Sequence, residues 1–247
     1  MSSVQTAAEL LERYAAWDRD FHHIRLDAVD LSGAYLRDIN LRGADLQNSK
    51  LKETILRGAQ LQEANLQRVQ LQRADLYGAD LQRASLDWAD LTGANLSGTH
   101  LYKTRLRGAN LTSANLRIVS AKQVDLQDAN LSMVNLEEAE LSGALLRGAE
   151  LQKASLLHAV LAEAQLAGAN LWLATLVGTQ LQKADLRVAN LQGANLQGAV
   201  LDGANLLGAN LRGADLRGAQ VVGVQWQGLF LMKKPALIRV SILWRRD

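Results

Sequence analysis

The residue types that most often do chemistry are sparse in this sequence, and their spacing does not bring them together. The chain has four histidines and no cysteine, which excludes thiolate catalysis, disulfides and cysteine-bound metal. His22 and His23 are adjacent and point apart in an extended segment, whereas His100 and His158 lie far along the chain. The densest carboxylates, within residues 137–140, are typical of a solvated face rather than of an acid–base pair. We therefore expect no catalytic residues, no metal site and no cofactor, and predict that the chain is not an enzyme.

The composition is that of a nearly neutral chain. Among 247 residues, 27 are Lys or Arg and 25 are Asp or Glu, which gives a formal net charge of +2. This balance argues against direct binding of nucleic acid and equally against an acidic mimic of nucleic acid. The beginning of the sequence does not read as a signal peptide, and no apolar run approaches the ~18 residues of a membrane helix. We expect a cytoplasmic chain without membrane contact.

The elements that would have to position any functional group are set by a repeat of five residues. Every fifth residue from Leu26 to Leu216 is leucine except Ala121, so the phase never slips. The residue two places before each leucine is usually alanine, and the residue directly before it is often Asn or Asp. All 19 glycines, from Gly33 to Gly228, lie two places after the central residue.

A period of five matches neither an α-helix nor a flat strand. It fits a short extended piece followed by a bend, with the leucine and the alanine pointing inward and glycine accommodating the bend. Four such sides close a coil of twenty residues, and coils stack at about 4.8 Å. The repeat therefore predicts an all-β, four-sided solenoid of about ten coils with a leucine-filled interior.

Units such as Ala94–Asn95–Leu96 resemble those of the pentapeptide repeat proteins. The resemblance implies a right-handed quadrilateral β-helix, and it implies little about function because the repeated residues are structural. The segment from Glu9 to Phe21 also resembles the N-terminal cap of cyanobacterial members of the family, including the HetL type. We accordingly divide the chain into an N-terminal capping helix (1–20), the repeat β-helix (21–228) and a C-terminal cap or dimerisation tail (229–247).

The two ends must cover unpaired backbone groups of the terminal coils. Residues from Thr6 to Trp17 read as an amphipathic helix that covers the first coil, with recruitment of a partner as the alternative. The C-terminal segment alternates apolar and polar residues like a strand. It could cap the last coil, hang free or touch a membrane, or form a homodimer, as the family members that protect DNA gyrase do. The candidate residues are Trp226, Phe230, Ile238, Val240, Ile242 and Trp244.

Two groups of outward residues stand out from the Gln, Asn and Ser of the other units. One is apolar and is a candidate partner-binding or self-association patch, because exposed apolar clusters with tryptophan favour protein contacts. The other is basic and would suit an acidic partner, with an ordinary solvated surface as the alternative. The apolar group is Leu157, Val160, Trp172, Leu173 and Val177; the basic group is Arg105, Arg107, Arg117 and Lys122.

With no catalytic constellation, the surface has to carry the function. We expect a non-catalytic protein–protein interaction scaffold, a regulatory binding protein whose partner the sequence does not name. The alternative implied by the family is a DNA mimic that binds DNA gyrase, as in the quinolone-resistance members. The net charge of +2 disfavours that alternative, although residues 123–164 form an acidic band with 7 acidic and 2 basic residues.

Overall fold

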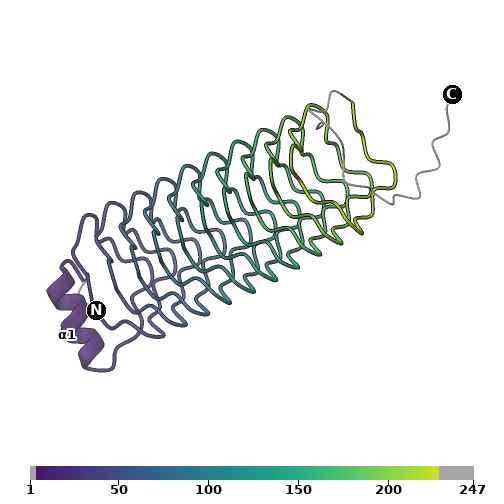
Figure 1. Ribbon diagram of the computed structural model, residues 1–247. Helices are drawn as coiled ribbons and strands as arrows, with labels where there is room; N and C mark the ends of the chain where they lie inside the picture. Colours follow the sequence, from purple (N-terminus) through teal and green to yellow (C-terminus); the bar gives the residue numbers. More distant parts are fainter. Residues whose placement is uncertain (1–3, 228–247) are drawn as a thin grey trace.

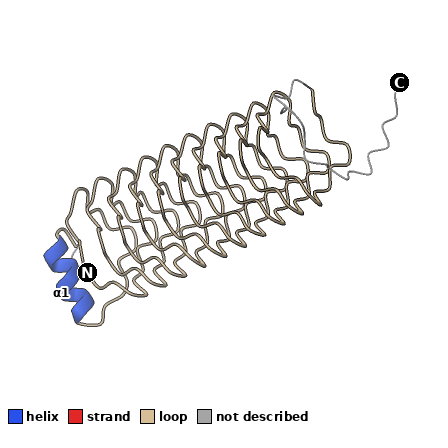
Figure 2. Ribbon diagram, in the orientation of Figure 1, coloured by secondary structure: helices blue, strands red, loops and turns tan. Residues whose placement is uncertain are grey.

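The computed structural model describes residues 4–227, which form an elongated stack of coils with the helix α1 across one end (Figure 1). Parallel bridges join residues twenty positions apart, from Asp20 with Asn40 to Asn205 with Gln225. One coil therefore takes four of the five-residue units, and the chain turns a corner after each unit. Each side pairs with the next coil at a single residue, so Figure 2 shows α1 and no continuous strand in the described part.

Each corner is a tight turn between the two inward residues of successive units. In the unit of Leu41, the backbone N–H of Ala44 donates to the carbonyl of Leu41 at 3.0 Å, and both side chains are fully buried. The residue two after the leucine is left-handed at every fifth position from His23 to Gly223. Glycine suits this conformation at Gly43 (φ 62°), but Trp88 adopts it as well (φ 62°). The coil therefore imposes the left-handed conformation on whichever residue stands at the corner. The sequence pattern had suggested that glycine accommodates this bend.

Backbone hydrogen bonds between coils replace those of a conventional sheet. The N–H groups of Leu41 and Gly43 donate to the carbonyls of Gln60 and Gln62, both at 2.8 Å. In the opposite direction, the N–H of Gln60 donates to the carbonyl of Ile39 at 2.9 Å. Because the same set recurs in nearly every unit, the buried backbone is satisfied without long strands.

The core is a set of columns that run along the rod. Leucines fill the large inward position and alanines the small one, and both are buried along almost the whole described length. Where the small position holds a hydroxyl residue, the hydroxyl donates to a backbone carbonyl, in most cases one of the previous coil. Thr54 Oγ1 donates to Leu31 O at 2.8 Å, and Thr104 Oγ1 to Leu81 O at 2.7 Å. Polar atoms therefore enter the core without being left unpaired.

The frequent Asn or Asp before each leucine has a structural role on the outside of the coil. The Asp30 carboxylate accepts the backbone N–H of Ser32 at 3.0 Å, which supports the turn that follows. An asparagine also reaches between coils, since Asn40 Nδ2 donates to Asp20 Oδ1 at 2.8 Å. These side chains are therefore used in holding the coil together.

The N-terminal helix α1 spans Ala7–Ala15 and begins with a capped turn. Thr6 Oγ1 accepts the N–H of Glu9 at 3.2 Å, so the cap occupies the predicted starting residue. Leu10 and Tyr14 are the buried residues of the helix, and Tyr14 Oη donates to the carbonyl of Arg37 at 2.8 Å. This contact ties the helix to the coil beneath it.

The helix ends two residues before the predicted boundary. The N–H of Asp18 donates to the carbonyl of Arg13 at 3.1 Å. Trp17 adopts the left-handed conformation (φ 69°) that commonly ends a helix and is usually held by glycine. Trp17 is 85% exposed, so it does not pack on the first coil as the predicted helix from Thr6 to Trp17 implied. The chain reversal at the end of the helix turns the indole outward.

The opposite end of the described part is open. Leu211 is buried, whereas the inward residues of the following units, Leu216, Val221 and Trp226, are only half-buried because no described coil covers them. Five of the six predicted cap or dimerisation residues, Phe230, Ile238, Val240, Ile242 and Trp244, lie outside the described residues.

Candidate protein-interaction surface

The described residues hold no convergent set of catalytic groups. His22 Nδ1 lies 2.7 Å from Asp20 Oδ1 on the exposed first coil, while His100 and His158 lie on different sides further along the rod. No cluster of three His, Asp or Glu residues that could hold a metal ion occurs between residues 4 and 227. None of the helices in that range is long and apolar enough to cross a membrane.

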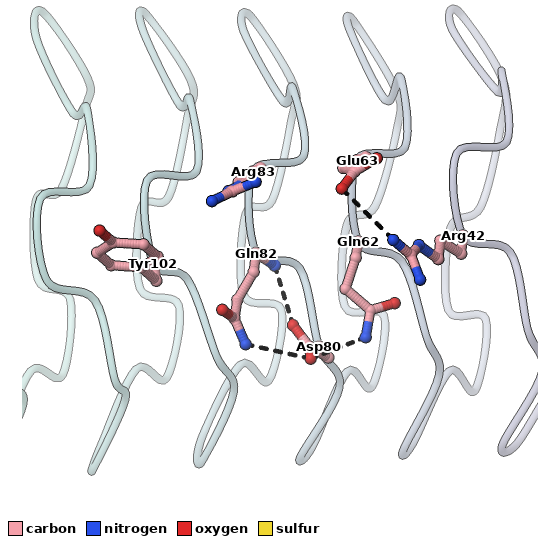
Figure 3. A pocket seen from close by; sticks show the side chains of 7 residues that line it. All are labelled: Arg42, Gln62, Glu63, Asp80, Gln82, Arg83 and Tyr102. Carbon is pink, nitrogen blue, oxygen red and sulfur yellow. Dashed lines mark hydrogen bonds and ion pairs between the residues drawn. The ribbon is translucent and has the colours of Figure 1, made fainter.

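A hollow of about 330 Å³ lies on one side of the rod (Figure 3). Its polar groups bind mainly one another, since the amides of Gln62 and Gln82 donate to Asp80 Oδ2 at 2.8 and 3.3 Å. Arg42 Nη2 lies 3.7 Å from Glu63 Oε1 on the rim. The hollow brings together mixed charges, and its lining residues include no nucleophile beside a base.

The predicted apolar residues are split between two neighbouring corners. Leu157 and Val177 occupy the same corner in successive coils, and the N–H of the residue after Leu157 donates to Val177 O at 3.0 Å. Trp172 and Leu173 form the preceding corner and are 37% and 43% exposed. The fifth residue, Val160, is half-buried on the side that follows Leu157. The side between the two corners shows polar residues, so the group forms two apolar clusters and stays a predicted binding surface.

The predicted basic residues are dispersed and balanced. Arg105 and Arg107 lie on one side of the coil, and Arg117 and Lys122 on two others. Each has a carboxylate partner that partly balances its charge, and a basic patch at these positions stays a prediction. The pairs are Arg105 with Asp87, Arg107 with Asp125 at 2.6 Å, Arg117 with Glu138 at 2.5 Å and Lys122 with Glu140 at 3.7 Å.

The sequence reasoning missed a surface at the N-terminal end of the rod. Three aromatic rings there are exposed, Trp17 by 85%, Tyr35 by 59% and Tyr77 by 51%. Tyr35 and Ile55 sit directly before their leucines, where Asn or Asp is common, and this departure was the available signal. We name this the N-terminal aromatic surface: Trp17, Arg19, Tyr35, Ile55, Arg57 and Tyr77.

Contacts link the members of this surface within its two parts. Arg19 lies between the cap and the rod, its guanidinium 3.7 Å from the Tyr14 ring and 5.3 Å from the Trp17 ring. Tyr35 and Ile55 are bridged in successive coils. The Arg57 guanidinium lies 6.0 Å from the Tyr77 ring, one coil further on.

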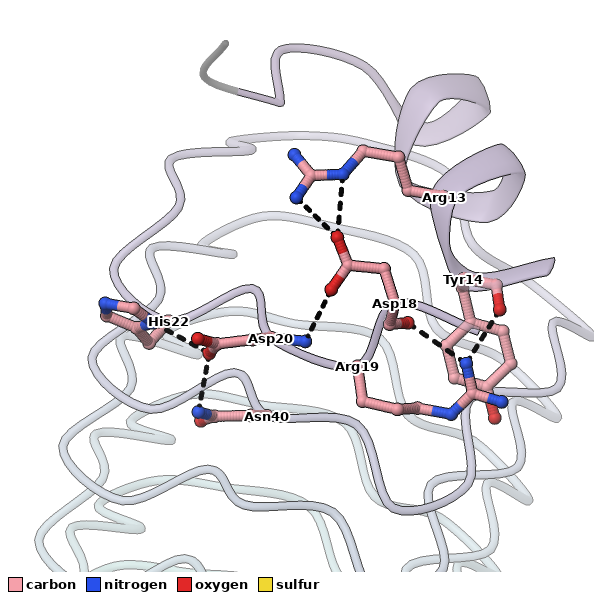
Figure 4. Close-up of polar contacts among 7 residues, drawn as sticks. All are labelled: Arg13, Tyr14, Asp18, Arg19, Asp20, His22 and Asn40. Atoms are coloured by element: carbon pink, nitrogen blue, oxygen red, sulfur yellow. Dashed lines mark hydrogen bonds and ion pairs between the residues drawn. The ribbon is translucent and has the colours of Figure 1, made fainter. Parts of the chain in front are cut away.

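The charges around the cap are fixed by short contacts (Figure 4). Two contacts to the Asp18 carboxylate hold its pKa below its usual range. The larger effect is the hydrogen bond from the N–H of Asp20, and the next is that from the Arg13 guanidinium at 2.5 Å. Burial raises the pKa of Tyr14, whose ring packs under Arg19. The cap is therefore an ordered part of this end of the molecule.

The structure is a four-sided solenoid whose candidate surfaces all face outward, and comparison with known proteins identifies its family. The model of the pentapeptide repeats matches in eight copies, leaving out the short segment that contains Ala121. The chain belongs to the pentapeptide repeat family, whose fold is the right-handed β-helix that the resemblance implied. The matched residues are 20–58, 54–93, 89–117, 125–160, 154–193 and 189–224.

Among solved structures, the chain is similar to HetL of the cyanobacterium Nostoc, a protein involved in the regulation of heterocyst differentiation. The two are 40% identical over 87% of this chain and 97% of HetL, with a TM-score of 0.50. Another pentapeptide repeat protein of Nostoc is 31% identical over 47% of this chain and 84% of its own, with a TM-score of 0.28. QnrB1, a plasmid-mediated fluoroquinolone resistance protein, is 21% identical over 83% and 86%, with a TM-score of 0.23. No curated protein matches the chain.

Proposed function

We propose that this protein is a non-catalytic interaction scaffold of the cytoplasm, a regulatory binding protein that binds a protein partner along its surface, as a relative of HetL. The observation that carries the proposal is the set of large aromatic rings exposed at the N-terminal end of a rod whose inward leucines and alanines are buried. Trp17, Tyr35 and Tyr77 are each more than half exposed, and Tyr35 stands where the repeat commonly has Asn or Asp. Aromatic side chains of this kind are favoured anchors of protein interfaces.

The ends complete the proposed scaffold. About ten coils form the rod, and α1 acts as its N-terminal cap, because the helix buries Leu10 and Tyr14 against the first coil. Residues 229–247 would cover the open C-terminal coil, either within the chain or by pairing with a second copy. Light scattering on the full chain and on a chain ending at residue 228 distinguishes these two arrangements, since only dimerisation through the tail makes the full chain larger than a monomer.

DNA mimicry of the gyrase-binding kind receives no support from the charge arrangement. The carboxylates of the acidic band that were its basis are partly neutralised, since Asp125 and Glu138 bind arginines and Glu140 a lysine. A DNA mimic needs rows of free negative charge. We therefore do not favour this alternative.

Affinity capture from a lysate of the source organism tests the scaffold. The baits are the full chain, a Leu157→Ser, Trp172→Ser, Val177→Ser variant and a Trp17→Gly variant, each checked for folding by circular dichroism. A defined partner that the full chain retains and one surface variant loses supports the proposal and places the binding surface. Turnover of a small-molecule substrate by the purified chain, or the absence of any partner that a surface variant loses, argues against it.

A further inference from the structure

The N-terminal aromatic surface combines ring anchors with arginines on two adjoining parts of the fold. Trp17 and Arg19 belong to the segment after α1. The other members lie on one side of the rod, in successive coils. Tyr14 joins the two, because its hydroxyl donates to Arg37 O at 2.8 Å while its ring supports Arg19. Tyr35, Ile55 and Tyr77 continue from there along the rod. Tryptophan, tyrosine and arginine are the residues most enriched where interfaces bind tightly.

Trp17 occupies a backbone position that works against a tryptophan. At φ 69° it holds the left-handed position after the helix, where glycine is usual and a bulky residue is an outlier. Its side chain is 85% exposed, so little packing compensates for the strain. A strained and exposed indole is a cost to folding, and such costs are concentrated at functional positions.

Arg19 places a positively charged hydrogen-bond donor beside that indole. Its Nη1 donates to the carbonyls of Tyr14 and Asp18 at 2.7 and 3.0 Å, which fixes the plane of the guanidinium (Figure 4). No acceptor in residues 4–227 binds its Nε or Nη2, and no carboxylate pairs with it. A guanidinium held in this way presents two parallel donors, the geometry that binds a carboxylate. Arg57, by contrast, already binds Asp75 at 2.5 Å.

We propose that the N-terminal aromatic surface binds an acidic segment of the protein partner, with a partner carboxylate on Arg19 and an adjacent apolar side chain against Trp17. The inference rests on the proposed scaffold function and names its binding surface and the chemistry of its partner. The choice of an acidic segment follows from Arg19. Among the described residues, its guanidinium has no carboxylate partner, whereas that of Arg57 already has one.

The test uses the full chain as target and a display library of random peptides as probe. Selected peptides are synthesised and measured against the wild type, Trp17→Gly and Arg19→Gln by fluorescence anisotropy. Glycine fits the left-handed position, so Trp17→Gly removes the anchor without harming the fold. Trp88→Gly is the matched control, because Trp88 is also an exposed tryptophan at a left-handed position, 62% exposed at φ 62°, and lies in a later coil.

We expect the selected peptides to contain Asp or Glu beside an apolar residue, and to bind at least roughly tenfold more weakly to Trp17→Gly, the scale of losing one anchor. Replacing the peptide carboxylate by its amide weakens binding to the wild type and changes little with Arg19→Gln, whereas Trp88→Gly binds like the wild type. Peptides without acidic residues, or equal binding to Trp17→Gly, overturn the inference. If the selected peptides are instead lost from the Leu157, Trp172, Val177 variant, the scaffold function stands and this surface assignment fails. If no peptide and no partner binds, both fail.

Discussion

The corner formed by Trp88 and Gly108 allows one contact between coils to be measured in isolation. The indole of Trp88 leans onto Gly108 of the next coil, and a Cβ added to Gly108 would collide with the ring, lying 2.8 Å from Cη2. Gly168 has the same left-handed backbone (φ 70° against 61°), but nothing lies within 4 Å of its added Cβ. Gly168→Ala is therefore the matched control for Gly108→Ala.

Both alanine substitutions cost about 1–2 kcal/mol of unfolding free energy, because an L side chain is strained at positive φ. Gly108→Ala must also expel the indole. Trp88 is 62% exposed, so roughly 60–90 Å² of a 150–250 Å² aromatic side chain is covered. At about 25 cal/mol per Å² the loss is about 1.5–2 kcal/mol. We expect Gly108→Ala to be destabilised by that much more than Gly168→Ala.

Urea unfolding followed by circular dichroism, in a cycle with Trp88→Ala, provides the measurement. With the indole removed, Gly108→Ala should cost no more than Gly168→Ala, so the cycle gives a coupling energy of about 1.5–2 kcal/mol. A coupling near zero, with equal losses at both glycines, would refute the reasoning. It would mean that the indole does not rest on Gly108 and that this glycine serves only the turn.

Three further results are expected. Trp17→Gly should raise the melting temperature, since about 1 kcal/mol of backbone strain is relieved; a lower melting temperature would contradict the strain. Thr54→Val should lower the unfolding free energy by about 1 kcal/mol in urea titrations, because a buried hydrogen bond to the previous coil is lost; an unchanged value would show that this bond contributes nothing. The N–H of Asp20 and the guanidinium of Arg13 lower the pKa of Asp18, so its stabilisation is complete above the ordinary value of 3.8 and is lost as the pH falls through the folded-state value. Hydrogen exchange in α1 should therefore speed up in acid, and Asp18→Asn should remove that part of the pH dependence.

The fold was predictable because its cause is local and repeated. The leucine at every fifth position and the small residue two places before it indicate which side chains point inward. The bridges between residues twenty apart confirm the coil. The end of α1 was less predictable: Trp17 has the spacing of the apolar face, yet the reversal after Ala15 turns it outward. Periodicity gives no information about such a reversal, which depends on the hydrogen bonds that close the helix.

The surface was predictable in part. The sequence places Leu157 and Val177 one coil apart, and the structure brings them to one corner. It could not reveal that Arg105 is balanced by Asp87, because a pairing between coils at 18 residues depends on how the side chains lean. The N-terminal aromatic surface was hidden for a similar reason, since it joins the segment after the helix to residues of three coils.

Because contacts join residues twenty apart, the length of the rod can change by whole coils. Deleting five residues would rotate everything beyond the cut by a quarter turn, whereas deleting twenty, such as 125–144, would leave every remaining side facing as before. One coil less shortens the rod by about 4.8 Å. The distance between a partner bound at the N-terminal end and anything bound at the other end can thus change in equal steps while each stays on the same side of the coil. Such a rod can set spacing without resetting orientation.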